Sequence, residues 1–223
     1  MLAGTIETNQ TKQNDHRRFI PALCAWFIAC YSIGSTQARA QDQTAQLIEE
    51  LRRGGYVIFL RHAATDHAQK DTNPDNLDDC KQQRNLSEAG RNQAKIIGEA
   101  FQSLRIPVGD VYSSVFCRCL DTATIAFGKV IKTPEISSIQ DLPAAQRDIR
   151  VKALRDLLHR PAQPGTNTVI VSHLYLFEFA AGTTVEEGEA AFFKPKADKS
   201  GIEFVARMKA AGWADIVTRY GSK

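Results

Sequence analysis

The chain has 223 residues, with 28 basic and 25 acidic side chains, a net charge of +3 and 43% hydrophobic residues. This length predicts one domain with its own core, and the composition excludes disordered, collagen-like and coiled-coil proteins. So small a net charge gives no support for nucleic-acid binding.

The first forty residues have the order of charge and hydrophobicity that is typical of a secretory signal peptide. Arg17-Arg18 precedes an apolar stretch, Phe19 to Ile33, and Ala38-Arg39-Ala40 supplies small residues for cleavage. The apolar stretch is shorter than the roughly 20 residues that a transmembrane helix needs. We therefore expect a signal peptide over 1–40, with an uncleaved anchor or a misassigned start codon as alternatives.

After cleavage, residues 41–223 are expected to form one domain in the periplasm or outside the cell, without stable membrane insertion. Three cysteines remain in it: Cys80, Cys117 and Cys119. An oxidising compartment permits one disulfide and leaves one thiol. Cys80 can pair with either of the other two, and three free thiols are also compatible with the sequence.

The first predicted elements are a helix, a buried strand and a long loop. Leu47, Ile48 and Leu51 have helical spacing, and Gly54-Gly55 ends that helix. The continuous apolar run 56–60 predicts a strand that is buried on both faces. The polar segment 61–86 is long enough for a functional loop. Ser87 follows as a helix N-cap.

Helices and short strands then alternate along the rest of the chain. We predict helices at 87–104, 116–127, 144–159 and 174–181, strands at 111–113 and 168–172, an irregular segment at 129–142, and late edge strands at 190–193 and 202–206. Such alternation predicts an α/β domain with a mainly parallel sheet. In these sheets ligands bind beyond the carboxyl ends of the strands.

Two histidines and two arginines follow the ends of three predicted strands. Arg61 and His62 come after 56–60, Arg118 lies just past 111–113, and His173 comes after 168–172. Arginine has a planar fork that matches phosphate oxygens, and a neutral imidazole can attack phosphorus. Cationic neighbours would lower the pKa of His62 and keep it nucleophilic. The set therefore predicts phosphoryl transfer that needs no metal and no cofactor.

Four segments of the chain, in order, resemble the motifs of the histidine phosphatase superfamily, also called the phosphoglycerate mutase-like family. They are Leu60 to Thr65 for the RHG motif, Leu86 to Gly90 with Gln93-Ala94, Ser113 to Arg118 with Thr122-Ala123, and Val171 to His173 for the second histidine motif. The resemblance covers about residues 56 to 176. It implies a phosphoglycerate mutase-like α/β fold, a three-layer sandwich with a mainly parallel central sheet.

The resemblance also implies roles for the site residues. His62 would be the nucleophile, and Arg61, Arg118 and His173 would bind the phosphoryl group. Some positions depart from the family pattern: Ala63 replaces glycine, Val115 replaces proline, and the bulky Leu174 stands where glycine is frequent. We expect Leu174 to narrow or reshape the pocket. The family's proton donor is a carboxylate, for which the sequence offers Asp66, Asp141, Glu178 and Glu187 without a choice among them.

The expected function is that of an exported phosphomonoesterase acting on a small phosphorylated substrate. The alternatives are a protein phosphohistidine phosphatase if the chain is not exported, a phosphate mutase, or a binding protein that holds a phosphorylated sugar without turnover. Cys117-Arg118-Cys119 does not have the C-x-x-C spacing typical of zinc sites, so no metal site is expected. The sequence does not indicate the oligomeric state.

Overall fold

The computed structural model describes residues 43–73, 76–196 and 201–221. The expected signal peptide lies outside these residues. All the elements discussed here belong to one compact unit, Thr44–Lys223. No helix among the described residues has the length and apolar character needed to cross a membrane.

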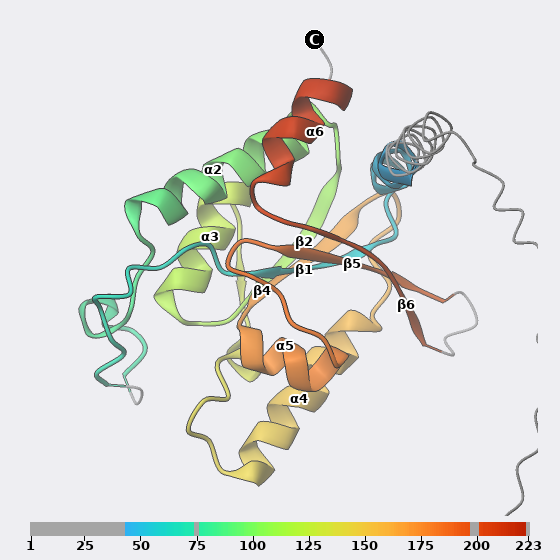
Figure 1. Ribbon diagram of the computed structural model, residues 1–223. Helices are drawn as coiled ribbons and strands as arrows, with labels where there is room; N and C mark the ends of the chain where they lie inside the picture. Colours follow the sequence, from blue (N-terminus) through green and yellow to red (C-terminus); the bar gives the residue numbers. More distant parts are fainter. Residues whose placement is uncertain (1–42, 74–75, 197–200, 222–223) are drawn as a thin grey trace, which may run out of the picture. The chain divides into compact units, whose positions relative to one another are not determined.

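Six strands form one mixed sheet in the order β3-β2-β4-β1-β5-β6 (Figure 1). The pairs β1/β4, β2/β4 and β2/β3 are parallel, whereas β5 is antiparallel to both β1 and β6. The strands are β1 (Val57–Arg61), β2 (Val108–Ser113), β3 (Ile131–Lys132), β4 (Asn167–Ser172), β5 (Ala190–Pro195) and β6 (Ile202–Met208). This is the predicted α/β architecture with a mostly parallel sheet.

Helices cover both faces of the sheet, which gives the three layers expected (Figure 1). A helix over 44–53 packs on one face with α2, α3 and α6, and α4 and α5 pack on the other. Strand β1 contributes to both cores, because Ile58 and Leu60 face the first group while Val57 and Phe59 face the second. The labelled helices are α2 (Glu88–Ser103), α3 (Cys117–Phe127), α4 (Ala144–Leu158), α5 (Leu174–Ala181) and α6 (Gly212–Tyr220), with short 3-10 turns η1 (Cys80–Gln82) and η2 (Pro134–Ile136).

The C-terminal part differs from the sequence-based expectation. Strand β5 was expected at an edge, but it lies between β1 and β6, and only β6 is an edge strand at that side. Helix α6 was not predicted at all. Its Trp213 is fully buried in the core between Phe101 and Phe192. Trp213 is therefore a packing residue of the core.

The strand register brings the predicted site to one edge of the sheet. Arg61 of β1 is paired with Ser172 of β4, and Ser113 of β2 is paired with Val171. Because these three parallel strands end level with one another, the residues that follow them emerge at the same edge. His62, Ser114 and His173 are those residues.

Candidate active site

His62 lies directly beyond β1, and two backbone hydrogen bonds hold it in place. Its N–H donates to Ser172 O at 3.1 Å, and its carbonyl accepts from Gly188 N at 3.0 Å. The ring atom Nδ1 lies 3.0 Å from Ala63 O. A carbonyl oxygen only accepts, so Nδ1 carries the proton in this contact. In the neutral ring, Nε2 then has the free lone pair that a nucleophile needs.

The motif at the start of α2 fixes the backbone that follows His62. Ala64 O accepts from the backbone N–H of Ser87, and Ala64 N donates to Gln93 Oε1 at 2.9 Å. Gly90 packs so closely here that a Cβ would come within 1.8 Å of Ala64 O. Ser87 also caps α2, as predicted, by accepting from Gly90 N. Glycine is required at this position because the helix and the site loop touch.

His173 is the N-cap residue of α5 and faces His62. The two ring centroids are 5.5 Å apart, at an interplanar angle of 64°. His173 Nε2 lies 2.8 Å from Ser114 Oγ and 3.6 Å from Cys119 Sγ. The ring also meets the edge of Phe116. Ser114, the residue that follows β2, thus fixes the orientation of the second histidine.

Arg61 is anchored from the loop between α5 and β5. Its Nη1 donates to Val185 O at 3.1 Å, and its Nη2 lies 3.5 Å from Glu187 Oε1. Glu187 also accepts hydrogen bonds from the backbone N–H and hydroxyl of Thr65. The Glu187 carboxylate therefore links Arg61, which precedes His62, to Thr65 in the loop that follows His62.

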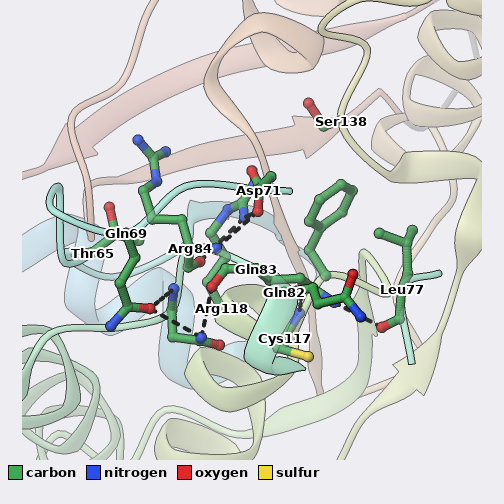
Figure 2. Close-up of polar contacts among 12 residues, drawn as sticks. Thr65, Gln69, Asp71, Leu77, Gln82, Gln83, Arg84, Cys117, Arg118 and Ser138 are labelled. Atoms are coloured by element: carbon green, nitrogen blue, oxygen red, sulfur yellow. Dashed lines mark hydrogen bonds and ion pairs between the residues drawn. The ribbon is translucent and has the colours of Figure 1, made fainter. Parts of the chain in front are cut away.

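Arg118, in the first turn of α3, is 3% exposed and is held by the long loop (Figure 2). Its Nη1 donates to Asp71 Oδ1 at 3.0 Å and lies 3.3 Å from Arg84 O. The same Asp71 oxygen accepts from the backbone N–H of Arg84. The guanidinium lies over the ring of Phe116. One aspartate thus positions two arginines.

Burial and positive charge keep both histidines neutral. Burial is the largest cause that lowers the pKa of His62, to about 3, and Arg118, Arg61 and Arg84 lower it further against an opposing bond to Ala63 O. Burial likewise lowers the pKa of His173 well below its ordinary value, followed by the charge of Arg118. The sequence-based argument named cationic neighbours, which act in the expected direction but are second to burial.

Three guanidinium groups around His62 each have a buried Nε atom with no hydrogen-bond partner among the described residues. They belong to Arg61, Arg84 and Arg118. Buried donors without partners are costly and uncommon in folded proteins. An anion at this place would satisfy them and would offset the concentration of positive charge. The arrangement is therefore that of a pocket for an oxyanion beside a neutral imidazole.

Residues 57–140 match the family model of the histidine phosphatase superfamily, branch 1. No protein of curated function matches the sequence. The family match supports the expectation of a phosphatase-type enzyme and covers three of the four motifs, up to the turn before α4.

Two solved structures share the fold over 70% and 68% of this chain. The protein histidine phosphatase SixA, complexed with tungstate, has a TM-score of 0.52 at 16% identity, covering 70% of this chain and 97% of SixA. A protein named mycobacterial hydrolase 1 has a TM-score of 0.50 at 17% identity, covering 68% of this chain and 97% of its own. Both likenesses concern the fold.

The four predicted site residues come together, while the candidate proton donors separate into two groups. Asp66 caps a turn by accepting from Ala68 N and Gln69, and Glu178 is exposed on α5. Glu187 is bound to Arg61 and Thr65. Asp141 lines a cavity that also contains Arg84 and Phe116. Of these four candidates, Glu187 binds a site residue, and Asp141 lines the cavity that contains Arg84.

Leu174 is partly buried and lines a different cavity, of about 400 Å³, together with Arg61 and Val185. It does not line the cavity that contains Arg84. The expectation that Leu174 reshapes the phosphate pocket remains a prediction.

Asp71, Arg84 and Ser114 were not assigned roles from the sequence. Ser114 was part of a quoted motif, and its place at the end of a strand was a usable signal. Asp71 and Arg84 lie in the long loop, whose length indicated function but whose irregular backbone gives no periodicity from which to choose residues. Their importance follows only from their contacts with Arg118.

The structure shows which of the three cysteines are paired. Cys80 in η1 and Cys117 at the start of α3 form a disulfide, and Cys119 is a buried free thiol. Burial raises the pKa of Cys119 to about 12, so this thiol is unreactive. Within residues 43–73, 76–196 and 201–221, no group of three or more His, Cys, Asp or Glu side chains could hold a metal ion.

The depressed pKa of His62 predicts sensitivity of the fold to acid. The folded-state pKa of about 3 lies below the ordinary value of 6.5, so the unfolded chain takes up the proton first as pH falls. Stability is therefore complete above pH 6.5 and declines as pH falls from 6.5 towards 3. Because of His62 alone, we expect the free energy of unfolding at pH 4.5 to be about 3 kcal/mol lower than at pH 7.5. Urea unfolding at pH 7.5, 5.5 and 4.5 measures this loss.

His62→Asn removes the titrating ring and should flatten part of that pH dependence. His159→Asn is the matched control, because His159 is exposed at the end of α4 and its ring bonds the backbone carbonyl of Arg155. Equal pH dependence of the wild-type protein and His62→Asn between pH 6.5 and 4.5 would contradict the argument.

Proposed function

We propose that this protein is an exported phosphomonoesterase that hydrolyses phosphate esters through a phosphohistidine on His62. The observation that carries the proposal is the His62 ring itself. It is neutral, its Nδ1 is committed to Ala63 O, and its Nε2 is left as the nucleophile among three arginines. SixA, which shares the fold, is a protein histidine phosphatase whose structure contains the oxyanion tungstate.

In the first step, Nε2 of His62 attacks phosphorus and the bond from phosphorus to the ester oxygen breaks. The guanidiniums of Arg61 and Arg118 and the ring of His173 bind the non-bridging oxygens. Their positions are fixed before the reaction by Glu187, Asp71 and Ser114. Such preorganised charge stabilises the transition state without reorganisation during the reaction.

The departing oxygen needs a proton, and Asp141 is the residue that we assign to this step. It lines the same cavity as Arg84 and Phe116, whereas Glu187 is committed to Arg61 and Thr65. In the second step, the Asp141 carboxylate takes a proton from water as the water oxygen attacks the phosphohistidine. The nitrogen–phosphorus bond breaks, and inorganic phosphate and neutral His62 are released.

Replacing Asp141 by asparagine should therefore harm poor leaving groups most. A nitrophenolate departs without help from an acid, whereas an alkoxide needs the proton. We expect kcat/KM for an alkyl phosphate to fall on the order of 100-fold, and kcat/KM for nitrophenyl phosphate to fall much less. Steady-state kinetics with both substrates measures the difference.

Glu187→Gln is the comparison variant for this experiment. It weakens the anchor of Arg61 and should lower both rates by a similar factor. If Glu187→Gln, and not Asp141→Asn, showed the selective loss with alkyl phosphates, the assignment of the proton donor would be wrong.

Export is supported by two independent features of the chain. The N-terminal forty residues have the pattern of a signal peptide. The disulfide between Cys80 and Cys117 is of a kind that persists in oxidising compartments and is rare in the cytosol. Fractionation of cells that produce the full chain with a C-terminal tag tests export, and retention in the cytosol would refute it.

A second candidate function is protein phosphohistidine phosphatase, favoured by the likeness to SixA. Localisation separates the two, because a cytosolic full-length protein favours this second candidate. A third, phosphate binding without turnover, requires tight binding of vanadate or phosphate and no hydrolysis of any ester.

The main proposal is tested with purified full-length protein and nitrophenyl phosphate. We expect vanadate-sensitive hydrolysis and, after rapid quenching with base, an acid-labile phosphate bound to the protein. Hydrolysis that proceeds unchanged in His62→Ala would refute the mechanism.

A further inference from the structure

Ser114, Ser137 and His173 form a buried polar cluster beyond the ends of β2, η2 and β4. Each of the three is at most 5% exposed. His173 Nε2 lies 2.8 Å from Ser114 Oγ, which lies 3.3 Å from Ser137 Oγ. A hydroxyl hydrogen rotates, so the distances alone do not give the donor in either contact. The donors and acceptors around the cluster fix these directions.

Backbone N–H groups take up part of the acceptor capacity of the two serines. Phe116 N donates to Ser114 Oγ at 3.3 Å, and Val115 N donates to Ser137 Oγ at 3.4 Å. A hydroxyl has one hydrogen and two acceptor sites, so each serine keeps one acceptor site. Burial, which lowers the pKa of His173 well below its ordinary value, leaves its ring neutral with one N–H.

One arrangement of the hydrogens satisfies the whole cluster. Ser137 donates to Ser114, Ser114 donates to His173 Nε2, and the ring proton is on Nδ1. In the reverse arrangement Nε2 donates to Ser114 and Ser114 donates to Ser137. The hydroxyl hydrogen of Ser137 then has no acceptor among the described residues. An unpaired hydroxyl at a buried position is costly, so the first arrangement is favoured.

The second ring nitrogen, His173 Nδ1, is the one left for a ligand. The ring faces that of His62, with the centroids 5.5 Å apart. Within the described ranges Nδ1 has no hydrogen-bond partner, yet it is not one of the buried nitrogen atoms that lack a partner. It is therefore accessible. With a proton, Nδ1 can donate to an oxyanion, whereas a lone pair at this place would repel it.

We propose that Ser114 is a positioning residue that sets the tautomer of His173, so that the ring meets the phosphoryl group as a hydrogen-bond donor. This inference rests on the proposed function, in which His173 binds a non-bridging oxygen. Both site histidines then have the proton on Nδ1, with opposite uses. His62 donates from Nδ1 to Ala63 O and attacks with Nε2, whereas His173 accepts at Nε2 and donates from Nδ1.

Nitrogen-15 NMR of the histidine rings in the full-length protein tests the tautomer directly. The chain has five histidines, and His173→Gln identifies the signals of His173. We expect a protonated Nδ1 and an unprotonated Nε2, both in the free protein and with inorganic phosphate bound. A proton on Nε2 of the wild-type protein, or one that moves to Nδ1 only when phosphate binds, would overturn the inference.

Substitution of Ser114 tests the cause of the tautomer. In Ser114→Ala we expect a mixture of both tautomers, about tenfold weaker binding of inorganic phosphate, and a fall in kcat/KM for nitrophenyl phosphate of about tenfold to a hundredfold. Ser114→Thr keeps the hydroxyl and should restore the Nδ1 tautomer. Ser137→Ala should also keep it, because this change removes the alternative acceptor for the Ser114 hydrogen.

Ser113→Ala is the matched control. Ser113 is as buried as Ser114, but its hydroxyl donates to Ser114 O and not to His173. It should leave the tautomer unchanged and the phosphate affinity within about twofold. An equal loss of affinity in Ser113→Ala and Ser114→Ala, or a loss in Ser114→Ala with the tautomer unchanged, would give Ser114 a packing role and refute the inference.

Failure of the proposed function has a different signature, namely no hydrolysis of nitrophenyl phosphate by the wild-type protein. The tautomer and the affinity for inorganic phosphate are both measured without turnover. In that case a protonated Nδ1 that is lost in Ser114→Ala still supports the assignment of Ser114, and a protonated Nε2 in the wild-type protein still refutes it.

Discussion

Replacing His62 by asparagine is expected to lower kcat on nitrophenyl phosphate on the order of 10⁴-fold or more. Asparagine has a similar volume, and its amide can donate to Ala63 O in place of the ring. It has no nitrogen that could form a bond to phosphorus. The oxyanion pocket stays intact, so phosphate and vanadate should still bind within a small factor of their wild-type affinity.

His159→Asn is the control for this substitution, since it removes an exposed histidine from the end of α4. Two readouts separate chemistry from folding: the rate of hydrolysis, and the acid-labile phosphate trapped on the protein. Both should vanish in His62→Asn and persist in His159→Asn. A His62→Asn protein that still forms a phosphorylated intermediate would assign the nucleophile to another residue.

The sequence predicts the central part of the fold well because each element there has an unambiguous signal. The run 56–60 is apolar throughout, and β1 is buried on both faces. Ser87 is the N-cap of α2, where a polar side chain satisfies a free backbone N–H. The predicted helix 174–181 corresponds to α5 and ends at Gly182, which adopts a left-handed conformation.

The C-terminal elements were harder to place because their positions depend on long-range pairing. The segment 190–193 was expected at an edge, but β5 continues the sheet from β1 and is covered on both faces. Sequence patterns predict that a segment is a strand, but they do not give its neighbours. Helix α6 spans nine residues, and helices that short are stabilised by packing, here through Trp213 against the core.

The site residues also fall into two groups: those whose place follows from the local sequence, and those whose place depends on long-range contacts. Arg61, His62 and His173 come directly after buried strands, so a topological rule is enough to place them together. Arg84 and Asp71 reach the site because a loop folds back across the start of α3. Nothing in the local sequence fixes the path of such a loop, and a disulfide helps to hold it.

Reduction of the Cys80–Cys117 disulfide is expected to destabilise the protein by about 4 kcal/mol. The bond closes a loop with a sequence separation of 37, and a cross-link of that span removes conformational entropy from the unfolded chain. For a domain of this size the melting temperature should fall by roughly 10 °C. Thermal unfolding with and without dithiothreitol measures the shift.

The same disulfide should also affect catalysis, because it ties the long loop to the residue before Arg118. Gln83 Oε1 accepts from Cys117 N, and Asp71 holds the Arg118 guanidinium from the same loop. When the loop loosens, Arg118 and Arg84 lose their fixed positions, and kcat/KM should fall roughly tenfold to a hundredfold. Cys80→Ser/Cys117→Ser should match the reduced wild-type protein and be insensitive to dithiothreitol. If the reduced protein kept full stability and activity, the hydrogen bonds from Asp71 and Gln83 would be sufficient to hold the loop, and the disulfide would have no part in positioning Arg118.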